Sequence, residues 1–289
     1  MNYLCYDVGG TFVKYAVVQE DGTFVSKSKF PTRADNAEQF FGDLAKVAAS
    51  APADIAGIGV SFPGFVDPHT GVAKRAGALG HLDGVNLIAA FQAQLKRPLP
   101  IAIENDAKCA ALAEMLNGNA TDVKNFAVIT LGTGVGCGIV LDGRVLHGGH
   151  FRAGEFGMSI TDYGQRGYAT LHDLAATSSL VKAYAQAKGL PVAEASGEAI
   201  MANLADPTTE TVVRQWAAHV AIAIFNLVAT LDPERVLIGG GISKNPKILP
   251  YIKDALADIP FWTDYQTDVA LCKHDNDAGL LGALAIAKQ

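Results

Sequence analysis

The chain has 289 residues, of which 49% are hydrophobic and 18% are charged, and its formal net charge is −6. This composition is typical of a soluble globular protein with enough apolar residues for two hydrophobic cores. The acidic balance, with a pI of about 5.6, argues against a nucleic-acid-binding surface.

The cysteines and the apolar stretches indicate a cytoplasmic protein. The four cysteines are scattered along the chain and form no C-x-x-C motif, which predicts reduced and mostly buried thiols. The N-terminus has no basic segment, and Asp7 interrupts its first apolar run, so we expect no secretory signal. The longest apolar stretch, residues 217–231, contains His219 and Asn226 and favours a buried helix over a membrane span.

Two similar stretches, residues 4–18 and 127–140, open the two halves of the chain. Each has an apolar run, a glycine turn with Gly-Thr inside it and a second apolar run, followed by Asp-Gly. This pattern predicts a β-hairpin with a tight glycine turn. Glycine lets the backbone take positive φ and come close to a ligand, and it leaves successive N–H groups free to point at phosphate oxygens. One copy alone would indicate only a turn, but two copies indicate a duplicated fold that grips a polyphosphate. The turn residues are Gly9, Gly10 and Thr11 in the first copy and Gly132, Thr133 and Gly134 in the second.

The remaining elements alternate between strands and helices. In the first half we expect three strands over 2–30, a helix over 36–50, a strand over 55–61, a helix over 87–95, a strand over 99–103 and a helix from 107. In the second half we expect helices near 171–187, 197–204, 209–231 and 245–257, strands over 235–238 and 269–272, and a last helix over 278–287. The polar connector near 117–124 marks the boundary between an N-terminal lobe, residues 1–117, and a C-terminal lobe, residues 118–277.

Asp106 is the strongest candidate for a catalytic base. It follows the strand that ends in Glu104-Asn105 and precedes a helix, where backbone N–H groups hold a carboxylate. Phosphoryl transfer to an alcohol needs such a group to orient the hydroxyl and accept its proton. The alternative is that Asp106 or Asn105 only caps the helix. One residue can fill both roles.

Other residues have both a functional and an ordinary interpretation. Asp7 is a candidate for holding Mg²⁺ through water, or a turn aspartate. Lys14 is a candidate for neutralising phosphate, or a solvated edge residue. The glycine run at 239–241 would let a nucleotide base or ribose lie against the backbone, or is a plain turn. Glu155 is a candidate acceptor for sugar hydroxyls.

His147 and His150 have spacing that suggests a metal site, but neither a cysteine nor a third histidine lies nearby in the sequence. Zinc sites need three or four such ligands, so we expect no zinc here.

As a set, these motifs resemble the ROK family (repressor, ORF, kinase). The motifs run in order along essentially the whole chain: Asp7-x-Gly-Gly-Thr11, Gly59-x-x-x-Pro-Gly-x-Val-Asp67, Glu104-Asn105-Asp106, Gly132-Thr133-Gly134-x-Gly136-x-Gly138, Ala153-Gly154-Glu155-x-Gly157, Gly239-Gly-Gly241 and Asp277-Ala278-Gly279. The resemblance implies an α/β protein with the actin-like ATPase (ribonuclease H-like) fold, with two α/β lobes and a cleft between them. The C-terminal helix, residues 278–289, would join the N-terminal lobe.

The resemblance also implies an activity, which is ATP-dependent phosphorylation of a sugar hydroxyl, usually O6 of a hexose, with Mg²⁺. Members of the family are often homodimers. Under this resemblance Asp106 would be the general base, and Gly64, Asn86, Asn105 and Glu155 would bind the sugar. Gly9, Gly10, Thr11, Gly132, Thr133 and Gly134 would hold phosphates, and Gly240 would lie near the adenosine.

Two departures from the family pattern bear on the substrate. Met158 stands where the family usually has a zinc-binding histidine, and residues 161–170 lack the three cysteines and the glutamate of its zinc motif. Since the missing histidine and glutamate ordinarily contact the sugar, their loss favours a modified sugar, with N-acetylmannosamine preferred. A β-glucoside kinase and a glucokinase or fructokinase are the alternatives.

The family also contains non-catalytic sugar-sensing regulators. Those proteins carry an N-terminal helix-turn-helix domain, and here the first glycine loop already begins at Asp7. The intact Asp106 and the two phosphate loops favour an enzyme.

Overall fold

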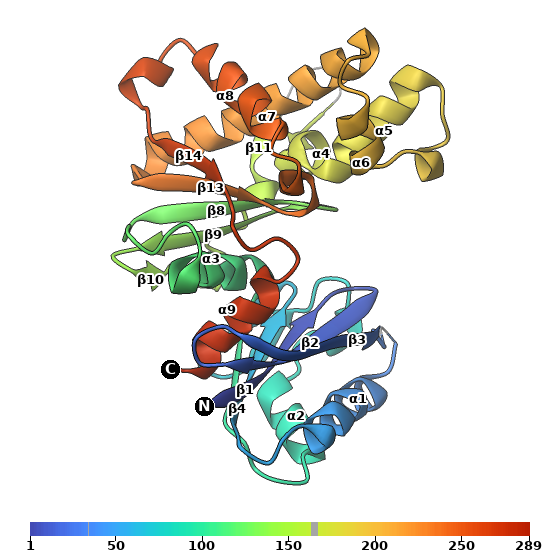
Figure 1. The fold of residues 1–289 in the computed structure, drawn as a ribbon, viewed down its shortest axis with the longest axis vertical. Helices are drawn as coiled ribbons and strands as arrows, with labels where there is room; N and C mark the ends of the chain where they lie inside the picture. The colour runs from blue at the N-terminus through green and yellow to red at the C-terminus, as the bar shows by residue number, and fades with distance from the viewer. Residues whose placement is uncertain (34, 163–166) are drawn as a thin grey trace. The chain divides into compact units, whose positions relative to one another are not determined.

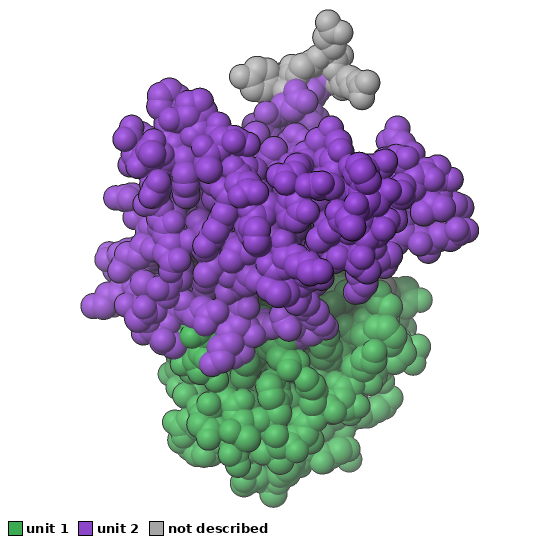
Figure 2. Space-filling view, turned by 45° about the horizontal axis from the view of Figure 1, so that its top comes forward, with its two compact units in different colours: residues 1–118, 147–152, 277–289 green, residues 119–146, 153–276 purple. Residues whose placement is uncertain are grey.

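The computed structural model describes residues 1–33, 35–162 and 167–289, and they form two compact units (Figures 1 and 2). Unit 1 comprises residues 1–118, 147–152 and 277–289, and unit 2 comprises residues 119–146 and 153–276. Residues 147–152 therefore belong to unit 1, whereas the sequence analysis assigned them to the second lobe. Side-chain contacts with unit 1, described below, hold this short segment there.

Unit 1 is built on a five-stranded mixed sheet in the order β3-β2-β1-β4-β7. Its strands are β1 (Asn2–Val8), β2 (Phe12–Gln19), β3 (Phe24–Pro31), β4 (Ile55–Phe62) and β7 (Ile101–Asn105). Strands β1, β4 and β7 are parallel, and β2 and β3 are antiparallel to their neighbours. The carboxyl ends of the three parallel strands therefore meet at one edge, where ligands bind in open α/β sheets.

Helices cover both faces of this sheet. Helices α1 (Ala37–Ser50) and α2 (Leu87–Gln94) cover one face, and α3 (Asp106–Asn117) and α9 (Ala278–Ala287) cover the other. The alternation of side chains along β1 explains this arrangement, because Leu4 and Tyr6 enter the first core while Tyr3 and Cys5 enter the second. Figure 1 shows α9, at the C-terminus, lying against the N-terminal strands.

Two glycines allow the backbone of α9 to come into direct contact with the backbones of β4 and α3. A Cβ atom on Gly59 of β4 would overlap the carbonyl of Ala283, and one on Gly282 would overlap the carbonyl of Cys109 in α3. Any larger residue at either position would push the helix away from the sheet or from α3.

Unit 2 repeats the topology of unit 1. Its sheet has the order β10-β9-β8-β13-β14, with β8, β13 and β14 parallel and β9 and β10 antiparallel to their neighbours. The strands are β8 (Phe126–Leu131), β9 (Val135–Leu141), β10 (Arg144–Val145), β13 (Arg235–Gly239) and β14 (Asp268–Leu271). The duplication suggested by the two glycine hairpins is therefore present in the strand order of both sheets.

The helices of unit 2 share one core with the sheet. They are α4 (Leu171–Ala175), α5 (Thr177–Lys188), α6 (Gly197–Ala202), α7 (Pro207–Leu231) and α8 (Ile248–Ala257). Helix α7 has the length and apolar composition of a membrane span. Its residues Val213, Trp216, Val220 and Ile224 are buried in the core, however, so α7 serves as the central helix of this unit.

Most elements lie within a few residues of their predicted positions, and the differences have local causes. The helix predicted over 171–187 is interrupted at Ala176, whose backbone is extended and whose carbonyl accepts a hydrogen bond from the Trp216 indole at 3.0 Å. The strand predicted over 99–103 lies at Ile101–Asn105, so its last two residues belong to the Glu104-Asn105-Asp106 motif. The hairpin of β5 (Phe65–Asp67) and β6 (Val72–Arg75) had no clear sequence signal.

Candidate active site

The edge of the unit 1 sheet brings together polar residues from three parallel strands. Asp7 of β1 pairs in register with Ser61 of β4, and Ser61 pairs with Glu104 of β7. The Ser61 hydroxyl donates to Asp7 Oδ1 at 3.0 Å, and the Lys14 ammonium lies 3.0 Å from Asp7 Oδ2. Lys14 therefore forms an ion pair with Asp7 as well as lying beside the predicted phosphate loop.

Asp7 fits the requirements of a water-mediated Mg²⁺ site. Mg²⁺ in kinase sites is usually held by one or two carboxylates together with water and substrate phosphates. Asp7 supplies one carboxylate, and its side chain is 18% exposed beside the glycine turn. Within the described part of the chain, no group of three or more His, Cys, Asp and Glu residues is placed to bind a metal. The remaining ligands would therefore come from water and from the phosphates.

Asp106 lies at the first turn of α3 with its carboxylate held in place. Its Oδ1 accepts hydrogen bonds from the Asn105 side-chain amide at 2.9 Å and from the Ala107 N–H at 2.8 Å. The helix cap is Asn105, whose Oδ1 accepts the Lys108 N–H at 3.1 Å. Asp106 is an exposed residue and does not serve as the cap itself. The two alternative roles considered for this motif thus fall on two adjacent residues.

Asn105 also links Asp106 to the Pro-Gly turn. Its Nδ2 donates to the Gly64 carbonyl at 2.9 Å. Gly64 has φ of +86°, and a Cβ there would overlap the carbonyl of Arg75, so this turn requires glycine. Gly64, Asn105 and Asp106 are therefore brought together in unit 1, as expected for three of the predicted sugar-binding residues.

Asn86 is engaged in the local structure. It caps α2 by accepting the Ala89 N–H at 2.9 Å, and its Nδ2 donates to the Thr70 carbonyl at 2.9 Å. An amide oxygen has two lone pairs, so the cap leaves room for a second hydrogen bond at this atom.

The pairing of Glu104 with His147 was not predicted from the sequence. Glu104 is buried, its Oε1 accepts the Asn105 N–H at 2.7 Å, and its Oε2 lies 2.6 Å from His147 Nε2. A buried carboxylate requires hydrogen-bonding partners. A glutamate at the end of an apolar strand signalled that need, but nothing in the sequence identified a partner 43 residues away.

The two glycine turns do not use the positive φ that glycine permits. Among the described glycines, those with positive φ do not include Gly9, Gly10, Gly132 or Gly134. Gly134 is instead required by the close approach of a neighbouring side chain, because a Cβ on Gly134 would lie 2.8 Å from the His172 ring.

Some of the turn amides are used within the turns themselves. Gly9 N–H donates to the Phe12 carbonyl at 3.0 Å, and Gly132 N–H donates to the Gly134 carbonyl at 2.9 Å. Amide contacts with phosphate would therefore fall to the other turn residues, Gly10, Thr11, Thr133 and Gly134.

A pocket of about 580 Å³ lies beside the glycine run in unit 2. Gly240 has φ of +92°, and a Cβ there would overlap the Leu131 carbonyl, so the chain turns closely against the end of β8. The walls come from α5, α6 and the turn after β13 and include Thr177, Glu198, Met201, Gly241, Lys244 and Asn245. The volume suits a small-molecule ligand such as a nucleoside.

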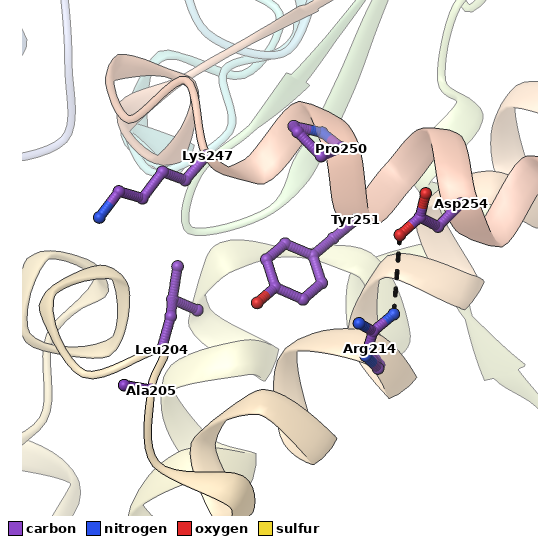
Figure 3. A pocket seen from close by; sticks show the side chains of 7 residues that line it. All are labelled: Leu204, Ala205, Arg214, Lys247, Pro250, Tyr251 and Asp254. Atoms are coloured by element: carbon purple, nitrogen blue, oxygen red, sulfur yellow. Dashed lines mark ion pairs between the residues drawn. The ribbon is translucent and has the colours of Figure 1, made fainter.

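A second pocket of about 450 Å³ shares Lys247 with the first (Figure 3). It is lined by α7, α8 and the residues Leu204 and Ala205 that precede α7. In it, Arg214 lies 3.7 Å from Asp254 and 5.1 Å from the centre of the Tyr251 ring. No glycine turn borders it, so the pocket beside Gly240 is the better candidate for a nucleotide.

Glu155 belongs to unit 2, in the loop that follows Gly154. Gly154 has φ of +89°, and a Cβ there would overlap the Cys137 carbonyl, which fixes this loop against β9. Met158, which replaces the expected histidine, is 59% exposed. Of the stretch that replaces the zinc motif, residues 163–166 lie outside the described residues, and its two sides form the strand pair β11 (Ile160–Asp162) and β12 (Ala169–Thr170).

Known proteins resemble this chain over its whole length. The model of the ROK family matches residues 3–289. A beta-glucoside kinase of Listeria innocua is 35% identical over 289 residues, covering 98% of this chain and 96% of that protein. An N-acetylmannosamine kinase of Pasteurella multocida is 28% identical over 295 residues, covering 98% and 95%. The solved structure of a ROK family protein from Streptococcus pneumoniae TIGR4 in complex with sucrose has a TM-score of 0.88 and 28% identity, covering 99% of this chain and 97% of that one.

These similarities confirm the predicted fold class, which is an α/β protein of the actin-like ATPase type. They also confirm the predicted enzyme class, because the named relatives are sugar kinases. On the strength of a family match that spans nearly every residue, the chain belongs to the ROK family as one of its sugar kinases.

Proposed function

We propose that this protein transfers the γ-phosphoryl group of ATP to the 6-hydroxyl of the glucose unit of a β-glucoside. The departures from the family motifs favoured N-acetylmannosamine, with β-glucosides as an alternative. The relatives favour the alternative, since the beta-glucoside kinase is 35% identical and the N-acetylmannosamine kinase 28%. The observation that carries the catalytic part of the proposal is the fixed orientation of the Asp106 carboxylate at the start of α3.

Asp106 is the proposed general base. As the sugar O6 attacks the γ-phosphorus, the O6–phosphorus bond forms, the bond from phosphorus to the leaving ADP oxygen breaks, and the hydroxyl proton passes to Asp106. A general base in such a position contributes about 10²- to 10⁴-fold to the rate. The two donors that hold Oδ1 keep the carboxylate oriented before the substrate arrives, which lowers the entropic cost of the reaction.

The proposed sugar contacts come from Gly64, Asn86, Asn105 and Asp106 of unit 1 and from Glu155 of unit 2. Asn105 supports this assignment because its amide already joins Gly64 to Asp106. A carboxylate such as Glu155 accepts stronger hydrogen bonds from hydroxyl groups than a neutral acceptor does.

The proposed phosphate contacts come from both glycine turns, and the adenosine would occupy the pocket beside Gly240. Mg²⁺ near Asp7 would neutralise charge on the phosphates. Lys14 adds a positive charge at the same edge of the sheet while it pairs with Asp7.

A coupled ADP-release assay with ATP and Mg²⁺ tests the proposal. The acceptors are cellobiose, a nitrophenyl β-glucoside, glucose, fructose and N-acetylmannosamine. We expect the highest kcat/KM for a β-glucoside. A preference for N-acetylmannosamine would contradict the proposed acceptor but would still support the kinase activity. If the folded protein released no ADP with any of these sugars, the result would contradict the kinase activity and favour a non-catalytic sugar-sensing regulator.

A further inference from the structure

We propose that the rings of His69, His147 and Phe151 form a subsite for the aglycone, the group attached to C1 of the β-glucoside. This inference rests on the proposed function, and all three residues belong to unit 1. The subsite would take an aryl group or a second sugar ring.

The three rings form a closed triangle of edge-to-face contacts. The ring centroids are 6.1 Å apart for His69 and His147, and 6.4 Å apart for Phe151 with each histidine. The interplanar angles of 60–66° belong to the favoured T-shaped geometry of aromatic pairs. The rings therefore support one another as a rigid platform.

The platform is joined to the proposed sugar site at separate points. His147 lies 2.6 Å from Glu104, which directly precedes Asn105 in β7. The neighbour of His69, Thr70, accepts a hydrogen bond from the Asn86 side chain at 2.9 Å.

The third connection runs through Arg152, the neighbour of Phe151. Its guanidinium lies 5.8 Å from the centre of the Phe65 ring, which follows Gly64. Each ring thus comes from a segment that contacts either a residue proposed to bind the phosphorylated glucose unit or the direct neighbour of such a residue.

Phe151 has a backbone conformation that bulky residues rarely adopt. Its φ is +61°, in the left-handed region, and such residues are usually strained. Strained residues persist where the surrounding structure holds them and are concentrated at ligand-binding and catalytic sites. Holding an aromatic ring at this position therefore points to a role for the ring itself.

The three rings remain partly accessible. His69 is exposed, the His147 side chain is 26% exposed, and Phe151 is half-buried. Ligand sites combine aromatic walls with a few polar groups that orient the ligand, and the two imidazoles supply such groups beside the phenyl ring. This chemistry suits an aryl group or a pyranose ring better than a bare hydroxyl.

The variants Phe151→Asn and His69→Ala remove one ring each. Asparagine tolerates the left-handed backbone conformation, so the first change removes the ring without adding strain. His147 is left intact because its loss would leave Glu104 buried without this partner. His150→Ala is the control, since His150 is exposed in the same segment and stands outside the three-ring cluster.

The measurement is kcat/KM for a nitrophenyl β-glucoside, cellobiose and glucose, with a thermal melt of each variant. We expect both ring variants to lower kcat/KM for the two β-glucosides by about 2- to 12-fold, the factor worth one aromatic contact, and to leave glucose unchanged. An equal fall for glucose would overturn the subsite in favour of a purely structural cluster, and unchanged kinetics with every sugar would overturn it too. Wild-type protein that turns over no β-glucoside would instead overturn the proposed function and, with it, the aglycone assignment.

Discussion

The two units have the same sheet but carry different chemistry at corresponding positions. Below the glycine turn of unit 1, β1 and β2 pair Asp7 with Lys14, whereas the corresponding pair in unit 2 is Thr130 with Gly136. The strand beside the central strand of each sheet also differs. In unit 1 this strand, β4, ends in the buried Ser61-Phe62, and in unit 2 the corresponding strand, β13, ends in Gly239. Unit 1 thus presents charged side chains at its sheet edge, and unit 2 presents mostly backbone.

This difference bears on how the proposed roles are divided between the two copies of the fold. The side chains proposed to accept the proton and to hold Mg²⁺ belong to unit 1, where three parallel strands and the cap of α3 position them. A bare backbone edge beside a pocket, as in unit 2, leaves room for a nucleoside. The topology alone does not assign either role, because function depends on the residues placed on the fold.

The largest effect is expected from Asp106→Asn in unit 1. We predict a fall in kcat of at least about 10²-fold, because asparagine cannot accept the hydroxyl proton. The melting temperature should stay close to that of the wild type, since Asn105 and not Asp106 caps α3. The matched control in unit 2 is Asp142→Asn, which keeps a residue tolerant of the left-handed φ of +52° and should leave kcat unchanged. Near-normal turnover by the folded Asp106 variant would contradict its assignment as the base.

The next effect concerns the packing of α9 on unit 1. Gly282→Ala should destabilise the protein by about 1–3 kcal/mol, because its Cβ would overlap the Cys109 carbonyl of α3. Gly42→Ala in α1 is the control, since its Cβ would meet no atom within 4 Å. That change should be neutral or stabilise by about 0.5–1 kcal/mol. Chemical denaturation measures both, and equal stability of the two variants would rule out the close approach of α9.

A smaller effect tests whether both glycine turns contact the phosphates. Thr11→Ala in unit 1 and Thr133→Ala in unit 2 each remove one hydroxyl, and both residues are exposed. Loss of one neutral hydrogen bond, about 0.5–1.5 kcal/mol, should raise the KM for ATP about 2- to 12-fold in each variant without changing the melt. The control is the exposed Thr121→Ala. If the KM for ATP rose in only one of the two variants, phosphate binding would be restricted to the glycine turn of that unit.

The smallest effect is a pH dependence confined to unit 2. The Lys188 ammonium beside Asp206, together with hydrogen bonds from Thr209, lowers the pKa of Asp206 from 3.8 to about 2. A lowered pKa in the folded state contributes stability that is present above pH 3.8 and is lost as the pH falls toward about 2. Asp206→Asn keeps a residue that can cap α7 but should flatten the change in stability across this window.

Tryptophan fluorescence reports on unit 2 alone, because the two tryptophans of the chain, Trp216 and Trp262, both lie there. Acid titration of the wild type and the Asp206→Asn variant therefore measures the predicted difference directly. Identical acid unfolding of the two proteins would show that this carboxylate contributes nothing to the stability of the unit.

Much of the fold could be predicted because local patterns agreed with it. The repeated hairpins indicated the duplication, and the apolar periodicity placed most helices to within a few residues. The candidate catalytic motif was also visible locally, since Glu104, Asn105 and Asp106 occupy the junction of a strand and a helix.

What could not be predicted depends on contacts between distant residues. The assignment of residues 147–152 to unit 1 rests on the Glu104–His147 pair and on ring contacts with His69, which no local pattern encodes. The close approach of the His172 ring, which excludes a side chain at Gly134, could not be predicted either, because His172 lies far from this turn in the sequence. The motifs were enough to indicate a sugar kinase, whereas they did not distinguish between N-acetylmannosamine and a β-glucoside as the acceptor.

The most direct test of the central claim is to locate the phosphate on the product by phosphorus–proton NMR after reaction of the wild type with cellobiose, ATP and Mg²⁺. We predict a single phosphate ester on C6 of the non-reducing glucose unit, with the β-glucosidic bond intact. A phosphate on C1 or on the reducing glucose unit would contradict the account, as would the formation of ADP and inorganic phosphate without any sugar ester.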